Sequence, residues 1–226
     1  MNINKFSKTG TFHRALHQDN QDYLLGIEGK DYITIMLADG ATACEKGLEG
    51  AKLSCQAMAQ VIEREGTVFF NYSKDKIAYL LIEQILYCIE CNKRETCDLR
   101  DYGSTFALIF MEKKTGRTVL VNLGDGAILS IDDEKKYSYL MRPKRYRGNP
   151  CLTTTKGAQK AIEIDVINVL LGNSLFLCSD GFLDMLKNND MVNLLNNYDI
   201  DGLNRMLLSE ENNDDCSYIS FTRRRK

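Results

Sequence analysis

Two apolar runs, each leading to an aspartate and then a glycine, constrain the fold of this chain more than any other feature. Residues 33–37 lead to Asp39, and residues 174–178 lead to Asp180. Large and β-branched apolar residues favour a buried strand, and a following glycine permits a sharp exit from it. Each run therefore predicts a buried strand that delivers one carboxylate to the rim of a sheet, where the two acids can meet.

An aspartate followed by glycine is also a common turn. The chain has four such pairs, which begin at Asp39, Asp125, Asp180 and Asp201. Taken singly, each pair predicts a turn. The apolar runs before two of them favour a functional interpretation, and so do Asp22, Asp214 and Asp215 beside other strand-like segments. Several carboxylates at strand ends are costly unless a cation compensates their charge.

Composition excludes several classes of protein. The 226 residues suffice for one large core, so we expect a single domain over residues 1–226. A net charge of −2 argues against binding to nucleic acid as the main function. No apolar run is long enough to cross a bilayer and residues 1–10 lack a signal-like apolar core, which predicts a cytoplasmic protein without a membrane partner. The eight scattered cysteines are interpreted as reduced thiols.

The order of the predicted elements indicates an α+β fold. Helical periodicity covers residues 48–64, 74–93, 190–195 and 200–208. Short strands separated by turns are predicted at residues 106–111, 118–123, 127–131, 138–141, 162–166, 174–178 and 218–221. The segment before Asp22 is predicted to be a loop. Helices on both sides of a strand meander predict antiparallel sheets, because a parallel sheet would need strands and helices in alternation.

Six short motifs occur in an order that resembles the type 2C metal-dependent serine/threonine protein phosphatase family, in its bacterial-type form. They are Asn20-Gln21-Asp22, Ala38-Asp39-Gly40, Gly103-Ser104-Thr105, Asn122-Leu123-Gly124-Asp125, Ser179-Asp180-Gly181 and Asp214-Asp215-Cys216-Ser217. Each motif is weak alone, but their shared order covers nearly the whole chain. The resemblance implies a sandwich of two antiparallel β-sheets flanked by helix pairs, an α-β-β-α arrangement.

The resemblance also implies a centre of two manganese or magnesium ions at one end of the sandwich, with room for a third. Asp39 would bridge both ions. Asp22 and the Gly40 carbonyl would hold one side, and Asp180 and Asp214 would hold the other. Hard oxygen ligands suit these cations, which can activate water at neutral pH and neutralise charge on a phosphoryl group.

Five further residues in these motifs receive other assignments. Residues 103–105 are assigned mainly to structure, because they open a strand near the site. Asp125 is likewise assigned to structure, in a hairpin turn. Asp215 is left with two interpretations: it orients Asp214, or it is itself a ligand if the register slips by one residue.

Two positions depart from the family pattern. Many members carry a phosphate-clamping arginine five residues before the first acid, where this chain has His17. Many also have a histidine soon after the central Asp-Gly, whereas residues 41–44 here are Ala-Thr-Ala-Cys. Some bacterial-type members that lack both groups have a glycine and a histidine ahead of a Gln-Asp pair, which Gly10 and His13 resemble. His13 is therefore a candidate for phosphate contact or proton donation, with plain hydrogen bonding as the alternative and Arg14 as a competing phosphate ligand.

These assignments combine into a functional prediction with Asp22, Asp39 and His13 as the catalytic residues. We expect hydrolysis of phosphoserine or phosphothreonine on proteins by a metal-activated water, in a signalling role. The alternative is a weak or inactive pseudophosphatase that acts as a binding module, motivated by the missing arginine and histidine. Phosphorylated proteins, or a serine/threonine kinase and its targets, are the expected partners of a monomer. The basic residues Arg142, Lys144, Arg145 and Arg147 are interpreted as solvated charge, with attraction of phosphorylated substrate as a secondary role.

Overall fold

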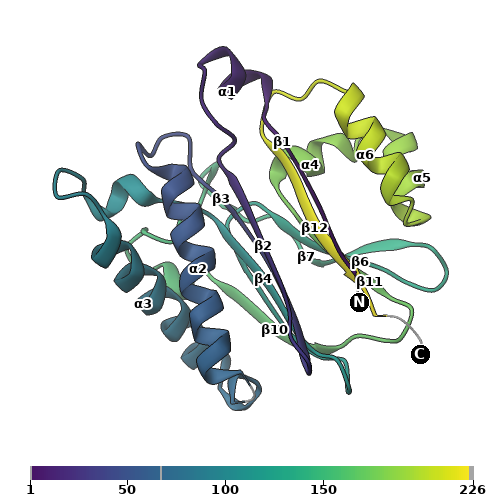
Figure 1. Ribbon diagram of the computed structural model, residues 1–226, viewed down its shortest axis with the longest axis horizontal. Helices are drawn as coiled ribbons and strands as arrows, with labels where there is room; N and C mark the ends of the chain where they lie inside the picture. The colour runs from purple at the N-terminus through teal and green to yellow at the C-terminus, as the bar shows by residue number, and fades with distance from the viewer. Residues whose placement is uncertain (1, 67, 224–226) are drawn as a thin grey trace.

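Two antiparallel five-stranded sheets pack against each other in the computed structural model, which describes residues 2–66 and 68–223 (Figure 1). One sheet has the order β1 (Ile3–Lys8), β12 (Cys216–Thr222), β11 (Ser174–Cys178), β6 (Ala127–Ile131) and β7 (Tyr137–Met141). The other has the order β10 (Glu163–Asn168), β5 (Arg117–Leu123), β4 (Phe106–Glu112), β3 (Tyr32–Asp39) and β2 (Asp22–Glu28). A short ladder pairs β8 (Arg145–Tyr146) with β9 (Asn149–Pro150).

Strand β3 shows why the first apolar run is continuous. Ile33, Ile35 and Leu37 lie in the core between the two sheets. Met36 and Ala38 point the other way, into the core under the helices. Successive side chains of a strand point to opposite faces, so a strand covered on both faces must be apolar at every position. The predicted buried strand is therefore observed, and its last residue lies at the rim of the sheet.

Helices cover the outer face of each sheet (Figure 1). The long helices α2 (Gly47–Glu65) and α3 (Lys74–Asn92) pack on the β3 sheet, and α4 (Asp180–Met185), α5 (Asn189–Asn196) and α6 (Ile200–Ser209) pack on the other. Short helical segments are α1 (Thr11–Ala15), η1 (Phe69–Asn71), η2 (Leu99–Tyr102) and η3 (Ala158–Lys160). The predicted α-β-β-α sandwich is confirmed.

Three elements depart from the prediction. Residues 3–8 form the edge strand β1, which pairs with β12 from the other end of the chain. The predicted loop before Asp22 contains α1, whose first amides donate to the carbonyls of Asn212 at 2.9 Å and Asn213 at 3.1 Å. Asp180 begins the short helix α4. β1 and α1 depend on partners about 200 residues away, and Gly181 in α4 packs against Asp215. Local periodicity does not encode such contacts.

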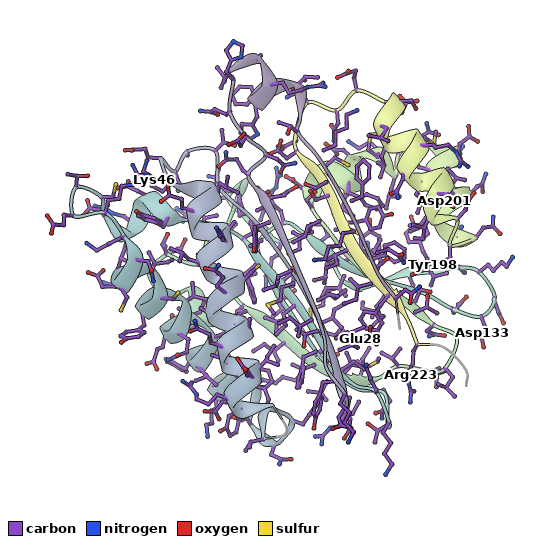
Figure 2. All side chains as sticks on the ribbon, viewed as in Figure 1. Glu28, Lys46, Asp133, Tyr198, Asp201 and Arg223 are labelled. Carbon is purple, nitrogen blue, oxygen red and sulfur yellow. The ribbon has the colours of Figure 1, made fainter. Side chains whose placement is uncertain are left out.

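The two ends of the sandwich differ in what they carry. Glu28 and Arg223 lie at the end opposite α1 (Figure 2). The end beside α1 contains the start of β2, the end of β3 and the start of α4.

Within the described residues, no helix is both long and apolar enough to span a membrane. All eight cysteines are unpaired in this part of the chain.

Candidate metal centre

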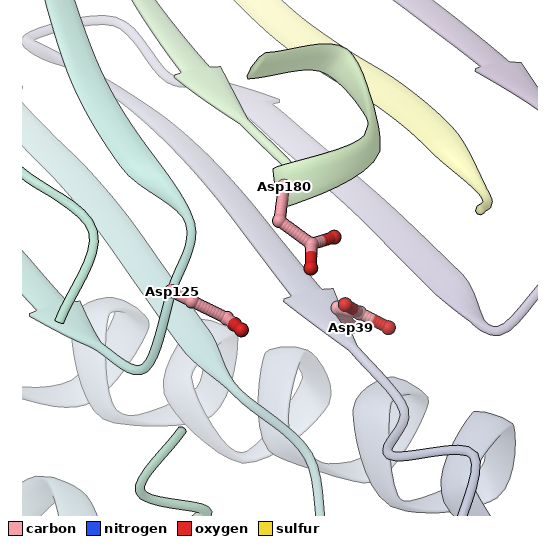
Figure 3. A group of neighbouring side chains, drawn as sticks. All are labelled: Asp39, Asp125 and Asp180. Atoms are coloured by element: carbon pink, nitrogen blue, oxygen red, sulfur yellow. The ribbon is translucent and has the colours of Figure 1, made fainter. Parts of the chain in front are cut away.

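Three aspartates from separate elements converge at the α1 end of the sandwich. Asp39 ends β3, Asp125 lies in the turn between β5 and β6, and Asp180 begins α4. Each offers a carboxylate oxygen, and these oxygens all lie within 4.8 Å of one another. Figure 3 shows the three side chains near one another, each from a different element. The acids that follow the two apolar runs thus lie together, and Asp125, which the sequence had suggested was structural, lies with them.

The glycines after Asp39 and Asp180 are required by close backbone contact. A Cβ atom on Gly40 would lie 2.3 Å from the carbonyl carbon of Gly47, at the start of α2. A Cβ atom on Gly181 would lie 2.0 Å from the carbonyl oxygen of Asp215. Neither Gly40 nor Gly181 has a positive φ. The need of a tight turn for a left-handed residue therefore does not explain these two glycines. A larger residue would push neighbouring chain away from the acids.

Asp22 carries the clearest sign that this end of the sandwich binds a cation. It is only 7% exposed, and neither carboxylate oxygen has a hydrogen-bond partner in the described part of the chain. Burial, together with three nearby aspartates, raises the pKa of Asp22 to about 8. The nearby Ser217 hydroxyl lowers the pKa of Asp22 only in part. Its proton is donated to Ser7 Oγ at 2.9 Å and not to Asp22. A buried carboxylate without donors is costly unless it is protonated or binds a cation.

The other acids share this unfavourable environment. Asp39 is paired with Asp22 across the β2–β3 ladder. Burial, followed by the charge of Asp22, raises the pKa of Asp39 well above its usual range. Burial and the charge of Asp125 raise the pKa of Asp180 to about 7, and burial also raises the pKa of Asp214. The residues present therefore fit divalent cations, since hard oxygen donors and excess negative charge are what such ions require.

Asp215 and Asp214 differ in what their carboxylates already bind. Asp215 Oδ1 accepts the Gly10 amide at 2.7 Å, and Oδ2 accepts the Gln21 amide at 2.6 Å and lies 2.9 Å from His13 Nδ1. These contacts commit both oxygens of Asp215 to holding the segment around α1. Asp214 Oδ1 accepts the Asp215 amide at 2.9 Å. Of the two interpretations of Asp215, the contacts favour an orienting residue over a ligand.

His13 lies inside the wall of the site and is 2% exposed. Its Nδ1 contacts Asp215, and its Nε2 lies 3.5 Å from Thr42 Oγ1. The carboxylate fixes the orientation of the ring and favours a proton on Nδ1, which leaves Nε2 facing the loop after Gly40. Arg14 points elsewhere and forms an exposed ion pair with Glu211. The geometry thus provides the plain hydrogen bonding that was the alternative interpretation of His13.

One basic side chain reaches the acids from the β8–β9 ladder. Arg145 forms ion pairs with Asp125 at 2.9 Å and with Asp180 at 3.1 Å. Half of the Arg145 side chain is exposed, whereas the Asp125 side chain is almost fully buried. The interpretation of the basic cluster as solvated charge is therefore wrong for Arg145. An arginine in a polar loop has no local pattern that identifies its partner, so the sequence did not reveal this contact.

Asp125 was missed for a related reason. An Asp-Gly pair between two predicted strands is the usual hairpin signal. The predicted hairpin is wrong here, because the turn that holds Asp125 joins β5 in one sheet to β6 in the other. The one sequence feature that favoured a role for Asp125 at the site was its place in the family motif Asn122-Leu123-Gly124-Asp125.

A family model matches most of this chain. Its description is protein phosphatase 2C, and it matches residues 9–209. The chain belongs to the protein phosphatase 2C family. This match confirms the family expected from the order of the motifs. Phosphatases of this family act on phosphorylated proteins and depend on manganese or magnesium, for which the converging aspartates provide suitable ligands.

Solved structures with the same fold include bacterial phosphatases. A bacterial serine phosphatase aligns with a TM-score of 0.75 at 17% identity, over 100% of this chain and 99% of that chain. The serine/threonine phosphatase Stp1 from Staphylococcus aureus gives 0.68 at 16%, over 98% and 94%. RsbX in complex with magnesium gives 0.61 at 12%, over 96% and 92%. At these identities the alignments show a shared fold. No curated protein matches the chain significantly.

Proposed function

We propose that this member of the protein phosphatase 2C family hydrolyses phosphoserine or phosphothreonine on proteins, with residues 1–226 acting as one phosphatase domain. The observation that supports the proposal best is the buried carboxylate of Asp22, which lies opposite Asp39 and near Asp180 and has no hydrogen-bond partner among residues 2–66 and 68–223. A structural carboxylate would have donors, as Asp215 has. An acid kept without donors at a site of clustered negative charge suits two manganese or magnesium ions.

Each acid has a proposed role in holding these ions. Asp39 would contact both, Asp22 and the Gly40 carbonyl would hold one side, and Asp180 and Asp214 would hold the other. When bound, such cations supply an activated water and neutralise charge on the phosphoryl group. The magnesium complex of the structural relative RsbX supports this choice of metal. A third ion beside Asp125 and Asp180 would have to displace the Arg145 guanidinium.

A pseudophosphatase that binds phosphorylated partners without turnover is the second candidate. It is favoured by His17 at the position of the phosphate-clamping arginine, and by residues 41–44, which lack a histidine. Turnover of a small aryl phosphate separates the two candidates, because a binding module would not hydrolyse it.

The purified protein is expected to hydrolyse an aryl phosphate only with added manganese or magnesium, and to keep its activity after iodoacetamide treatment. No cysteine attacks phosphorus in the proposed reaction. Cys178 is fully buried, and burial raises the pKa of both Cys178 and Cys44, which slows alkylation near the site. Rates are measured in chelator, with each metal, and after metal is restored. Full activity in chelator, or none under any of these conditions, would contradict the proposal.

His13→Ala is expected to lower turnover of a phosphopeptide by roughly 100-fold and to lower turnover of an activated aryl phosphate much less. An activated leaving group needs little protonation, so loss of a general acid has little effect on it. The Asp215 carboxylate also loses a partner, so the melting temperature should fall. The exposed neighbour Arg14 provides the control, as Arg14→Ala. Equal losses on the two substrates would leave His13 with hydrogen bonding alone.

A further inference from the structure

A surface pocket of about 480 Å³ adjoins the candidate metal centre. Its lining comes from the β8–β9 ladder, the segment 155–161 and Gly124. Gly124 immediately precedes Asp125, and Arg145 forms one wall of the pocket while it pairs with Asp125 and Asp180. A peptide whose phosphoresidue lies at the aspartates would therefore pass this pocket.

The residues that line the pocket give it a positive charge. Its charged side chains are all basic: Lys144, Arg145, Lys156 and Lys160. Lys144 pairs with Glu163 at 2.9 Å, and Arg145 pairs with two aspartates. Within residues 2–66 and 68–223, no ion pair involves Lys156 or Lys160. Two cations beside the site are thus left without compensating charge.

The segment that carries these two lysines is anchored to the core. Thr153 is fully buried, and its amide donates to the Ser104 carbonyl at 2.8 Å. Ala158 lies between the two lysines and is also fully buried. On the opposite wall, the Lys144 amide donates to the Gly124 carbonyl at 2.8 Å. The backbone therefore holds the cations around one pocket.

We propose that this basic pocket binds an anionic side chain of the substrate that lies close in sequence to the phosphoresidue. The inference rests on the proposed phosphatase function, and it names the substrate class as phosphopeptides with a second anionic group. That group is a carboxylate or a second phosphate, since Lys156 and Lys160 attract either. Tyr146, Pro150 and Ala161 provide apolar surface for the adjoining peptide.

The test compares phosphothreonine peptides of equal length that differ only in the residues flanking the phosphothreonine. These residues are glutamate, glutamine, lysine or phosphoserine. At low salt, the parent protein is expected to show a kcat/KM about fivefold higher for the glutamate peptide than for the lysine peptide, as for partly exposed ion pairs. The preference should shrink in about 1 M salt, which screens charges beyond about 3 Å. A larger gain with phosphoserine than with glutamate identifies phosphate as the preferred group.

Variants assign the preference to the pocket. Lys156→Gln combined with Lys160→Gln should bring the ratio between glutamate and lysine peptides close to one, with aryl phosphate turnover unchanged. The matched control is Lys30→Gln, an exposed lysine in the turn after β2 and so at the Glu28 end of the sandwich (Figure 2). It should keep the parent ratio.

The outcomes separate this inference from the proposed function. Equal kcat/KM for the glutamate and lysine peptides in the parent, or an unchanged preference in the double variant, would overturn the basic pocket while hydrolysis stands. If no substrate is hydrolysed, the proposed function fails. The preference is then measured from dissociation constants of the same fluorescently labelled peptides by anisotropy, and equal constants would overturn the pocket as well.

Discussion

Asp39→Asn is expected to remove nearly all metal-dependent hydrolysis while leaving the metal-free protein at least as stable as the parent. Asp39 lies opposite Asp22 and within 4.8 Å of the carboxylate oxygens of Asp125 and Asp180. Burial and these charges raise its pKa, so the neutral asparagine relieves repulsion in the absence of ions. Residues that merely support a metal ligand typically contribute about 10–100-fold, so loss of a direct ligand should cost more.

The matched control is Asp201→Asn, which replaces an aspartate that also precedes a glycine. Asp201 is exposed in α6, away from the acids (Figure 2). It should keep parental kinetics and the parental response to manganese. Rates are measured on an aryl phosphate, and melting temperatures are measured in chelator and in manganese. An Asp39→Asn protein that melts lower in chelator and still gains the full manganese shift would show that Asp39 is structural and would exclude the proposed centre.

Manganese is expected to raise the melting temperature by about 5–10 °C near pH 8 and much less near pH 5. A ligand at a hundredfold excess over its dissociation constant stabilises a protein by about 2.7 kcal/mol, and 1 kcal/mol shifts the melting temperature of a protein of this size by about 2–4 °C. The pH dependence follows from the acids, because the proton and the cation compete for the same carboxylates.

The sign of this dependence comes from the folded-state pKa values of Asp22 and Asp180. They are about 8 and about 7, against an ordinary value of 3.8. A carboxyl with a raised pKa favours the folded state while it is protonated, and that contribution is lost as the pH rises from about 4 toward the folded pKa. In chelator the protein should therefore lose stability across this window. Near pH 8 these acids hold fewer protons than near pH 5, so manganese displaces fewer of them and the gain in stability is larger there.

Melting temperatures from about pH 5 to pH 9, in chelator and in manganese, check this prediction. The control is Asp22→Asn, which removes the carboxyl with the higher of the two pKa values. It should therefore flatten the loss of stability with rising pH in chelator. A manganese shift of equal size at every pH, or a chelated protein that gains stability up to pH 8, would show that these acids do not share a site with the ion.

The sequence by itself was enough to predict the elements in which buried apolar residues recur at the spacing of a strand or a helix. The apolar run in β3 and the periodicity of α2 and α3 predicted these elements to within one or two residues. The order of the Asp-containing motifs was enough for the family, and hence for the sandwich. Apolar patterns and short motifs can both be read from neighbouring residues, because a buried strand is apolar at successive positions and a motif is a short run of residues.

Only the tertiary structure decided which acids share one site and what each of them contacts. Asp125 lies in the turn that takes the chain from β5 in one sheet to β6 in the other, and it joins the site because β5 ends and β6 begins beside Asp39. Asp215 differs from Asp214 through bonds to residues about 200 positions away. The ion pairs of Arg145 likewise join segments that are distant in sequence. A carboxylate or a guanidinium has the same local pattern whether its partner is water, a cation or another side chain, so its role follows from the neighbours that folding brings to it.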